Sequence, residues 1–189
     1  MPAVTLEQFK AHLNKSLNDT SQDDELEMTL GGAESLAERI VGGPLTNRGV
    51  TEDVYPVSGG TALLLTYRPV LNVISISTAG TTVGTSDVYV APGRVLRRRN
   101  GYGFSPYSSS PYTVTYTAGL GVTAPPAVQL AVLIIGSHLW DTQRGNATGN
   151  PGREDEYGTS STVTPGYGYA VPNRALELLS QWASETGLA

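Results

Sequence analysis

Two adjoining stretches decide the fold: Tyr112-Thr-Val-Thr-Tyr-Thr-Ala-Gly119 and, from Pro125-Pro126 onward, Ala127-Val-Gln-Leu-Ala-Val-Leu-Ile-Ile-Gly-Ser-His-Leu-Trp140. The first stretch alternates aromatic or β-branched residues with threonine, which is typical of a strand with one buried face. The second begins with prolines, which the first turn of a helix tolerates. It is apolar on almost every side, and such a helix lies at the centre of its fold. The sequence therefore predicts both an antiparallel sheet and a central helix.

The residues before this point, from about 50 to 119, have the period of strands. Short runs rich in Val, Ile, Thr and Tyr are separated by clusters of Gly, Pro and Ser. They predict a small antiparallel sheet of about five strands, at Thr61–Thr66, Val70–Ser77, Asp87–Val90, Val95–Arg98 and Tyr112–Thr117.

Helical periodicity returns at both ends of the chain. Thr5 and Gln8 have the spacing of a capping box, ahead of the stripe Leu6, Phe9 and Leu13. Carboxylates crowd the first turn of a second helix, which runs from about residue 21 to Gly42-Gly43-Pro44. Gly31-Gly32 within that helix costs about 1 kcal/mol per glycine relative to alanine. Either a neighbour packs closely there, or the helix bends, or the weak spot is tolerated.

These segments define the α+β class, with a small bundle of about four helices and an inserted antiparallel sheet. We expect a helical core at 1–143 with the sheet at about 50–119, a flexible loop rich in Gly, Pro and Ser at 144–170, and a C-terminal docking helix at 171–189. The last helix carries Leu176, Leu179 and Trp182 on one face.

Composition narrows the function classes. The chain has 189 residues, a net charge of −5, no cysteine and two histidines, which excludes disulfides and thiolate sites. It contains neither a membrane span nor a signal pattern, so we expect a soluble protein. Charge is uneven: residues 1–40 carry −5, residues 41–150 carry +3 and residues 151–189 carry −3. A dedicated duplex-DNA binder usually has a strong basic surplus, which this chain lacks.

Catalytic motifs are missing. His138 and Asp141 have the spacing of a base and its orienting group, but no nucleophile accompanies them, and local hydrogen bonding of His138 is the simpler interpretation. No phosphate-binding glycine motif follows a strand. The acidic residues from Asp23 to Glu27 suit a helix dipole better than a metal. We expect no enzyme, no catalytic residue, no cofactor and no metal site.

Two clusters remain as candidate contact sites. Arg97, Arg98 and Arg99 form a basic run on a predicted strand, where they would protect a sheet edge, form salt bridges between subunits or face DNA. Aromatic residues punctuate the following loop, and they either contact another molecule or pack back over the sheet. These aromatic residues are Tyr102, Phe104, Tyr107 and Tyr112.

Taken together, the segments resemble the head-tail connector, or adaptor, family of tailed bacteriophages. The resemblance rests on the order and spacing of several short strings rather than on any one of them. They are Leu6–Asn14, Asp23–Leu26, Gly43–Thr46, Tyr67–Leu71, Tyr112–Gly119, Pro125-Pro126, His138–Trp140, Thr142–Gly145 and Val171–Leu179. The sequence departs from the family pattern at Gly31-Gly32, in the aromatic loop and in its longer C-terminus.

The resemblance implies a structural virion protein that forms a ring of about twelve copies at the head-tail junction. Its partners would be the portal protein, a head-closure (stopper) or tail-completion protein and further copies of itself, with DNA passing weakly through the lumen and no membrane. It would be made in the host cytoplasm and end in the virion neck. Leu176, Leu179 and Trp182 would dock on the portal, the aromatic loop would contact a neighbouring subunit or ring, and the arginines would line the lumen or a subunit contact.

Three alternatives stay open at this point. The last helix either docks on the portal or closes the protein's own helical core. The tyrosine-rich loop also fits a soluble peptide- or polysaccharide-binding module. A hydrolase that uses His138 is the third.

Overall fold

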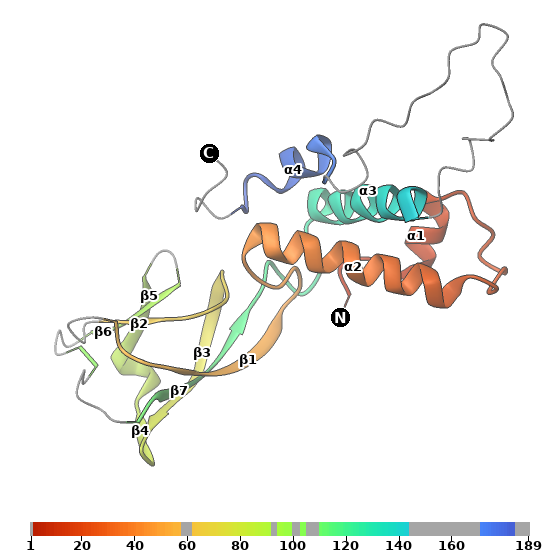
Figure 1. Cartoon of the computed structure of the whole chain (residues 1–189). Helices are drawn as coiled ribbons and strands as arrows, with labels where there is room; N and C mark the ends of the chain where they lie inside the picture. Colours follow the sequence, from red (N-terminus) through yellow and green to blue (C-terminus); the bar gives the residue numbers. More distant parts are fainter. Residues whose placement is uncertain are drawn as a thin grey trace, which may run out of the picture. The chain divides into compact units, whose positions relative to one another are not determined.

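The structure is a computed structural model that describes residues 2–57, 62–91, 94–99, 103–104, 110–143 and 171–183 (Figure 1). Its contacts divide the chain into two compact units. The sheet unit is Val41–Pro125, and the helical unit combines Pro2–Ile40 with the residues from Pro126 onward. The α+β prediction is confirmed, because four helices and two antiparallel sheets are present in the described residues.

The helical unit contains α1 (Leu6–His12), α2 (Asp23–Val41), α3 (Pro126–Gln143) and α4 (Asn173–Leu179). The predicted capping box starts α1: the Thr5 hydroxyl accepts from the Gln8 N–H at 3.2 Å, and the Gln8 side chain accepts from the Thr5 N–H at 2.9 Å. The largest buried side chains of this unit include Phe9, Leu26, Ile135 and Leu179. The last helix is shorter than the sequence predicted, because Ser180 to Ala183 form turns.

The sheet unit contains seven strands in two sheets. The first sheet has the order β1-β7-β3-β4, and the second has the order β2-β6-β5. The strands are β1 (Arg48–Val54), β2 (Leu63–Leu64), β3 (Val70–Thr78), β4 (Thr81–Val83), β5 (Val88–Ala91), β6 (Val95–Arg98) and β7 (Tyr112–Ala118), with the 3₁₀ turn η1 (Thr85–Asp87) before β5. The sequence predicted five strands in one sheet and missed β1 and β4.

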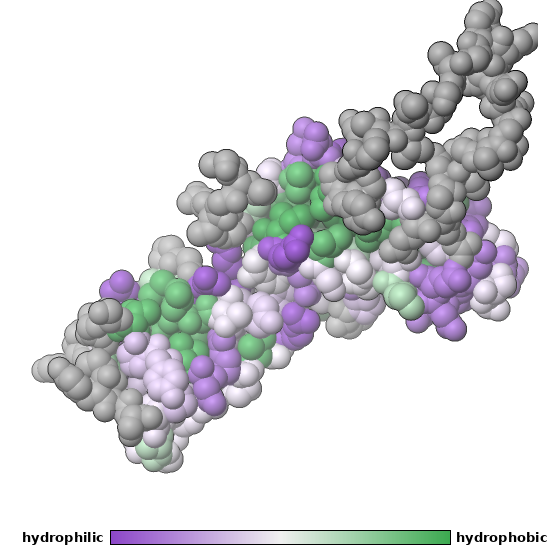
Figure 2. Space-filling view, viewed as in Figure 1, coloured by the Kyte–Doolittle hydropathy of each residue, from purple (hydrophilic) through white to green (hydrophobic). Residues whose placement is uncertain are grey.

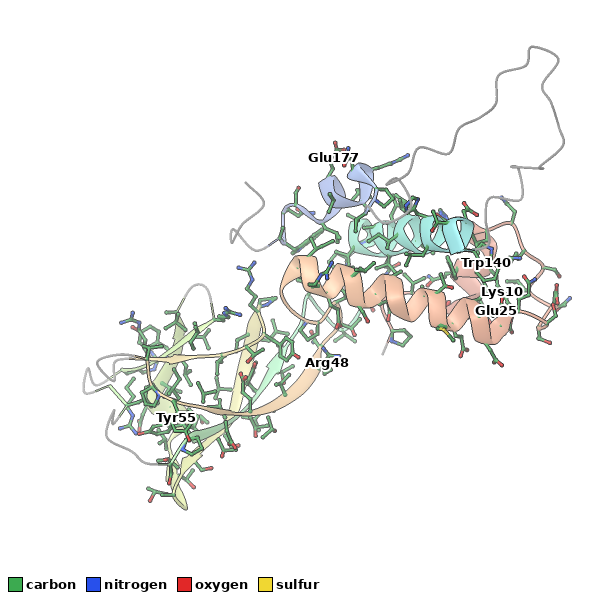
Figure 3. All side chains as sticks on the ribbon, viewed as in Figure 1. Lys10, Glu25, Arg48, Tyr55, Trp140 and Glu177 are labelled. Atoms are coloured by element: carbon green, nitrogen blue, oxygen red, sulfur yellow. The ribbon has the colours of Figure 1, made fainter. Side chains whose placement is uncertain are left out.

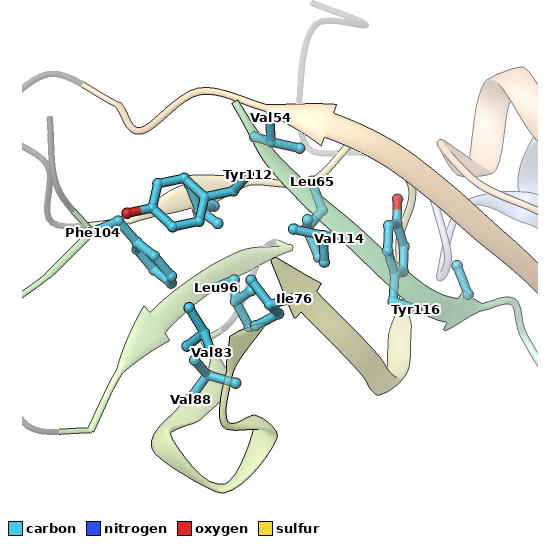
Figure 4. Packing of buried hydrophobic residues seen from close by; sticks show 12 residues of the cluster. Val54, Leu65, Ile76, Val83, Val88, Leu96, Phe104, Tyr112, Val114 and Tyr116 are labelled. Carbon is cyan, nitrogen blue, oxygen red and sulfur yellow. The ribbon is translucent and has the colours of Figure 1, made fainter. Parts of the chain in front are cut away.

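The two sheets share one hydrophobic core (Figure 4). The first sheet contributes the alternate residues Tyr112, Val114 and Tyr116 of β7, which are all buried. The second sheet contributes Leu63, Val88 and Leu96. The opposite face of the first sheet is rich in hydroxyl side chains, with Thr51 and Thr115 hydrogen-bonded across β1 and β7 at 3.0 Å.

Two β-bulges interrupt the pairing of β3 with β7. The register shifts between Val70 and Asn72 and again between Val73 and Ser75, so Leu71 and Ile74 are the extra residues. These two side chains are 50% and 53% exposed. Figure 2 shows hydrophobic surface in the part of the sheet unit where β2, β3 and β5 lie. Exposed apolar side chains on a strand favour pairing with a strand of another molecule. The two bulges in β3 oppose such pairing because they distort the strand.

The chain enters the sheet unit through a tightly packed turn at Gly43. A Cβ atom placed on Gly43 would lie 1.9 Å from the carbonyl oxygen of Arg68, which leaves room only for glycine. The turn at Arg68 is tied on both sides: its N–H donates to Gly42 at 3.4 Å, and the neighbouring Pro69 carbonyl accepts from Gly119 at 3.1 Å. The two glycines that follow α2 therefore also hold the turn at Arg68, which is hydrogen-bonded through Pro69 to Gly119 at the end of β7.

Candidate interaction surfaces

The last helix packs along α3 within the helical unit (Figure 1). Leu179 and Ala175 are completely buried, whereas Leu176 and Trp182 keep part of their surface. In this conformation Leu179 belongs to the protein's own core. Docking through Leu176 and Trp182 requires no rearrangement, but docking through Leu179 requires α4 to leave α3.

The aromatic residues after β6 divide into two groups. Phe104 and Tyr112 are 1% and 3% exposed, and their rings meet edge to face with centroids 5.2 Å apart (Figure 4). They pack over the sheet, which is one of the two interpretations that the sequence left open, and in this structure both side chains are buried. Tyr102 and Tyr107 lie outside the described residues, and their contact role stays a prediction.

The three consecutive arginines point in different directions. Arg97 is exposed on β6, and Arg98 lies on the core side with its guanidinium 5.4 Å from the centroid of the Phe104 ring. Arg99 donates from Nε to the Val88 carbonyl at 3.1 Å and stands 5.8 Å from the centroid of Tyr89. Within the described residues none of the three forms an ion pair with a carboxylate. Because side chains alternate along a strand, Arg97 and Arg98 lie on opposite faces of β6.

A polar network that the sequence did not reveal crosses the sheet unit. The Tyr116 hydroxyl donates to Glu52 Oε1 at 2.7 Å and accepts from the Tyr67 N–H at 3.2 Å. The same carboxylate accepts from the N–H of Thr66 at 2.8 Å and from its hydroxyl. Burial, followed by the hydrogen bond to Glu52, raises the pKa of the Tyr116 phenol far above its usual value. The network therefore holds the segment 66–67 against β1 and β7.

We expect Tyr116→Phe to lower the free energy of unfolding by about 1 to 3 kcal/mol, because Glu52 and the Tyr67 N–H each lose a buried partner. Because the folded pKa is raised, the phenol's contribution is complete below pH about 10 and is lost as the pH rises toward the folded pKa. Urea unfolding between pH 7 and pH 11 measures both effects. The exposed Tyr55 serves as control, since Tyr55→Phe should change stability by less than about 0.5 kcal/mol. Equal stability of Tyr116→Phe and wild type at pH 7 would contradict the network.

The acidic residues at the start of α2 take part in contacts that stabilise the helical unit. The ammonium of Lys10, which is almost fully buried, pairs with Asp23 and donates to the Asp19 carbonyl at 2.8 Å. Lys15 donates to Gln22 at 2.8 Å and stands 5.0 Å from the centroid of the Trp140 ring. Lys10 and Trp140 lie at the same end of the helical unit (Figure 3). These contacts fasten the segment between α1 and α2.

The catalytic alternative finds no support in the geometry. His138 Nε2 is buried and has no hydrogen-bond partner among the described residues, while Asp141 is exposed. Among the residues that the structure describes, no group of three His, Cys, Asp or Glu side chains is placed to hold a metal ion. Nor does any described helix have the length and apolar character needed to cross a membrane. What the described residues offer is a set of surfaces rather than a reaction centre.

A comparison of the sequence with protein families assigns the chain to a class of structural assembly proteins rather than enzymes. A sequence profile described as head completion protein matches residues 3–166. The chain belongs to the head completion protein family, as the resemblance in its sequence indicated. No curated protein matches the chain.

Solved structures with a similar fold come from gene transfer agent (GTA) particles. A chain in the neck of an empty GTA particle computed with C6 symmetry has a TM-score of 0.69 and 17% identity, covering 99% of this chain and 92% of that chain. A chain in the neck of the native particle computed with C12 symmetry has a TM-score of 0.68 and 16% identity, with the same coverage. A chain in the virion of the native GTA particle has a TM-score of 0.67 and 17% identity, also with the same coverage.

Proposed function

We propose that this head completion protein assembles as a ring of about twelve copies in the neck of a phage-like particle, between the portal and a tail-side completion protein. The observation that carries the proposal is the family match over residues 3–166, on a fold that is similar over 99% of the chain to proteins of a symmetric particle neck. DNA passes through the lumen of this ring. Twelve copies with a formal charge of −5 each would carry about −60, which keeps the contact with DNA weak.

Electron microscopy of the protein mixed with its portal tests the ring. The expected result is a ring of copies stacked on the portal, visible in symmetry-averaged images. The protein alone is not a sufficient test, because some interaction surfaces become ordered only when the partner binds. Absence of any ring on the portal under conditions where both proteins are folded would contradict the proposed function.

We place the portal contact on the partly exposed Leu176 of α4 and on the partly exposed Trp182 in the turn that follows this helix. Leu179 is fully buried, so it would contribute only if α4 moved away from α3. Aromatic side chains at the centre of an interface commonly carry most of its binding energy. This placement keeps the helical unit intact while its last helix binds the partner.

Trp182→Ala is the variant that separates docking from packing. We expect portal binding to weaken at least about tenfold, since removal of an interface tryptophan commonly costs more than about 1.4 kcal/mol. The thermal midpoint should stay within about 3 °C of wild type. Titration of labelled portal and a melting curve measure the two quantities, and Gln181→Ala, at the exposed neighbour, is the control. A fall of the midpoint by several degrees with unchanged portal affinity would show that Trp182 serves only the core.

A further inference from the structure

The outward side of the second sheet combines apolar and arginine side chains on one surface. The register places Leu64, Val95 and Ala91 in one row across β2, β6 and β5, and Tyr89 opposite Arg97 in the next row on the same side. Leu64 and Tyr89 are 45% and 41% exposed, and Arg97 is exposed. We call this surface, together with the Arg99 guanidinium that lies over Tyr89, the arginine face.

Its positive charge is not balanced inside the sheet unit. Val41–Pro125 contains six arginines, no lysine and three acidic residues, a net charge of +3. All three carboxylates accept hydrogen bonds from hydroxyl groups: Glu52 from Tyr116, Asp53 from Thr113 at 2.6 Å and Asp87 from Ser86 at 3.3 Å. The arginine face therefore presents guanidinium groups that no described carboxylate of the chain neutralises.

The chemistry of the face favours a protein partner over nucleic acid. Nonspecific binding to duplex DNA gains essentially all of its affinity from charge, whereas this surface has an apolar row beside its arginines. Tyrosine and arginine beside aliphatic side chains are typical of protein interfaces. Arg99 is held in place by its bond to Val88, so its planar group is already oriented for carboxylates.

The helical unit of the same chain has the complementary character. It contains six basic and fourteen acidic residues, a net charge of −8. On α2, Asp24, Glu27 and Met28 share one face at spacings of three and four residues, and all three are exposed. Met28 is 77% exposed, and neither Asp24 nor Glu27 has a partner among the described residues. We call the surface formed by Asp24, Glu27 and Met28 the acidic face; it consists of two carboxylates beside one exposed apolar side chain.

We propose that the arginine face of one copy binds the acidic face of α2 on the next copy. The inference rests on the proposed ring, because a ring needs a head-to-tail contact between two different patches of the same chain. Opposite charges on the two units give each copy such a pair of patches. Leu64 and Tyr89 would receive Met28, and Arg97 and Arg99 would receive Asp24 and Glu27.

A charge exchange tests the contact. Arg97→Glu alone and Asp24→Lys with Glu27→Lys should each reduce ring formation on the portal at least about tenfold, since like charges then face each other. The variant that combines all three changes should recover ring formation, because the attraction is restored with reversed signs. Ring formation is counted by electron microscopy and by native mass spectrometry. Arg39→Glu, an equal charge change at an exposed position on α2, is the control and should assemble like wild type.

The absence of cysteine provides a second readout. In assembled rings, Arg97→Cys with Glu27→Cys should give a ladder of linked copies with a short bismaleimide. Ser75→Cys with Glu27→Cys should not, because Ser75 is on the outward face of the first sheet.

Three results would overturn the inference. Normal rings from Arg97→Glu would exclude the arginine face from the contact. Failure of the combined variant to recover ring formation would show that the arginine face and the acidic face do not bind each other. Rings that form normally while Arg97→Glu loses binding to duplex DNA would assign the face to nucleic acid. Each of these leaves the proposed ring standing. A wild-type protein that forms no ring on the portal would instead contradict the proposed function, and this inference with it.

Discussion

Phe9→Ala is expected to lower the free energy of unfolding by about 3 to 5 kcal/mol, the range for removing a buried phenylalanine ring. Phe9 is completely buried on α1, a helix of seven residues. Its ring lies so close to α3 that a Cβ on Gly136 would be 2.9 Å away. A helix this short has little stability of its own, so packing of Phe9 is what keeps α1 in place. Urea unfolding followed by far-ultraviolet circular dichroism measures the loss.

The matched control for Phe9→Ala is Met28→Ala in the same unit. Met28 is 77% exposed, so its truncation should change stability by less than about 0.5 kcal/mol. A loss below about 1 kcal/mol for Phe9→Ala would mean that α1 does not depend on this contact.

Gly43→Ala is expected to cost about 3 kcal/mol, at the upper end of the effects of overpacking. The added methyl group would lie 1.9 Å from the Arg68 carbonyl oxygen and 3.0 Å from its backbone carbon and nitrogen. These are backbone atoms, so no side-chain rotation relieves the contact. The turn at Arg68 must move, and with it the hydrogen bond from Gly119 to Pro69. The thermal midpoint and the urea midpoint both measure the change.

Gly31→Ala is the control, and its sign should be opposite. Gly31 lies inside α2 with nothing within 4 Å of an added Cβ, so alanine should stabilise the helix by about 1 kcal/mol. Gly32 is similarly open, with only Leu139 at 3.9 Å. Thus no close packing within the described residues accounts for the glycine pair. Equal losses of stability in Gly43→Ala and Gly31→Ala would contradict the close contact between Gly43 and the Arg68 carbonyl.

Local signals predicted the helices well. The capping box of Thr5 and Gln8, the carboxylates in the first turn of α2 and the proline pair at the start of α3 each mark a helix start, and the structure places α1, α2 and α3 there. Such signals depend on neighbouring residues only. The missed strand β1 shows the limit, because Gly49, Glu52 and Asp53 have low strand propensity. Pairing with β7 over its whole length is what makes it a strand.

The contact surfaces were less predictable, for physical reasons. The hydrogen bond between Glu52 and Tyr116 joins residues 64 positions apart, and only the sheet register brings them together. The stripe of Leu176, Leu179 and Trp182 predicted a buried face but not what buries it, since a partner helix and the protein's own α3 have the same apolar chemistry. Phe104 and Tyr112 illustrate the same ambiguity, because an aromatic residue suits a core and an interface equally.

The pairing of β1 with β7 has a consequence for how the chain folds. Arg48 lies opposite Ala118, so the two ends of the inserted sheet segment are neighbours, about 5 Å apart across one ladder. Once this ladder has formed, the long segment between α2 and α3 acts as a short loop, and most of the entropic cost of bringing these helices together has already been met. Residues added at the far turn between β3 and β4, at Ala79 and Gly80, would leave that closure unchanged. We therefore expect insertions at this turn to leave the entropic cost of bringing α2 and α3 together unchanged.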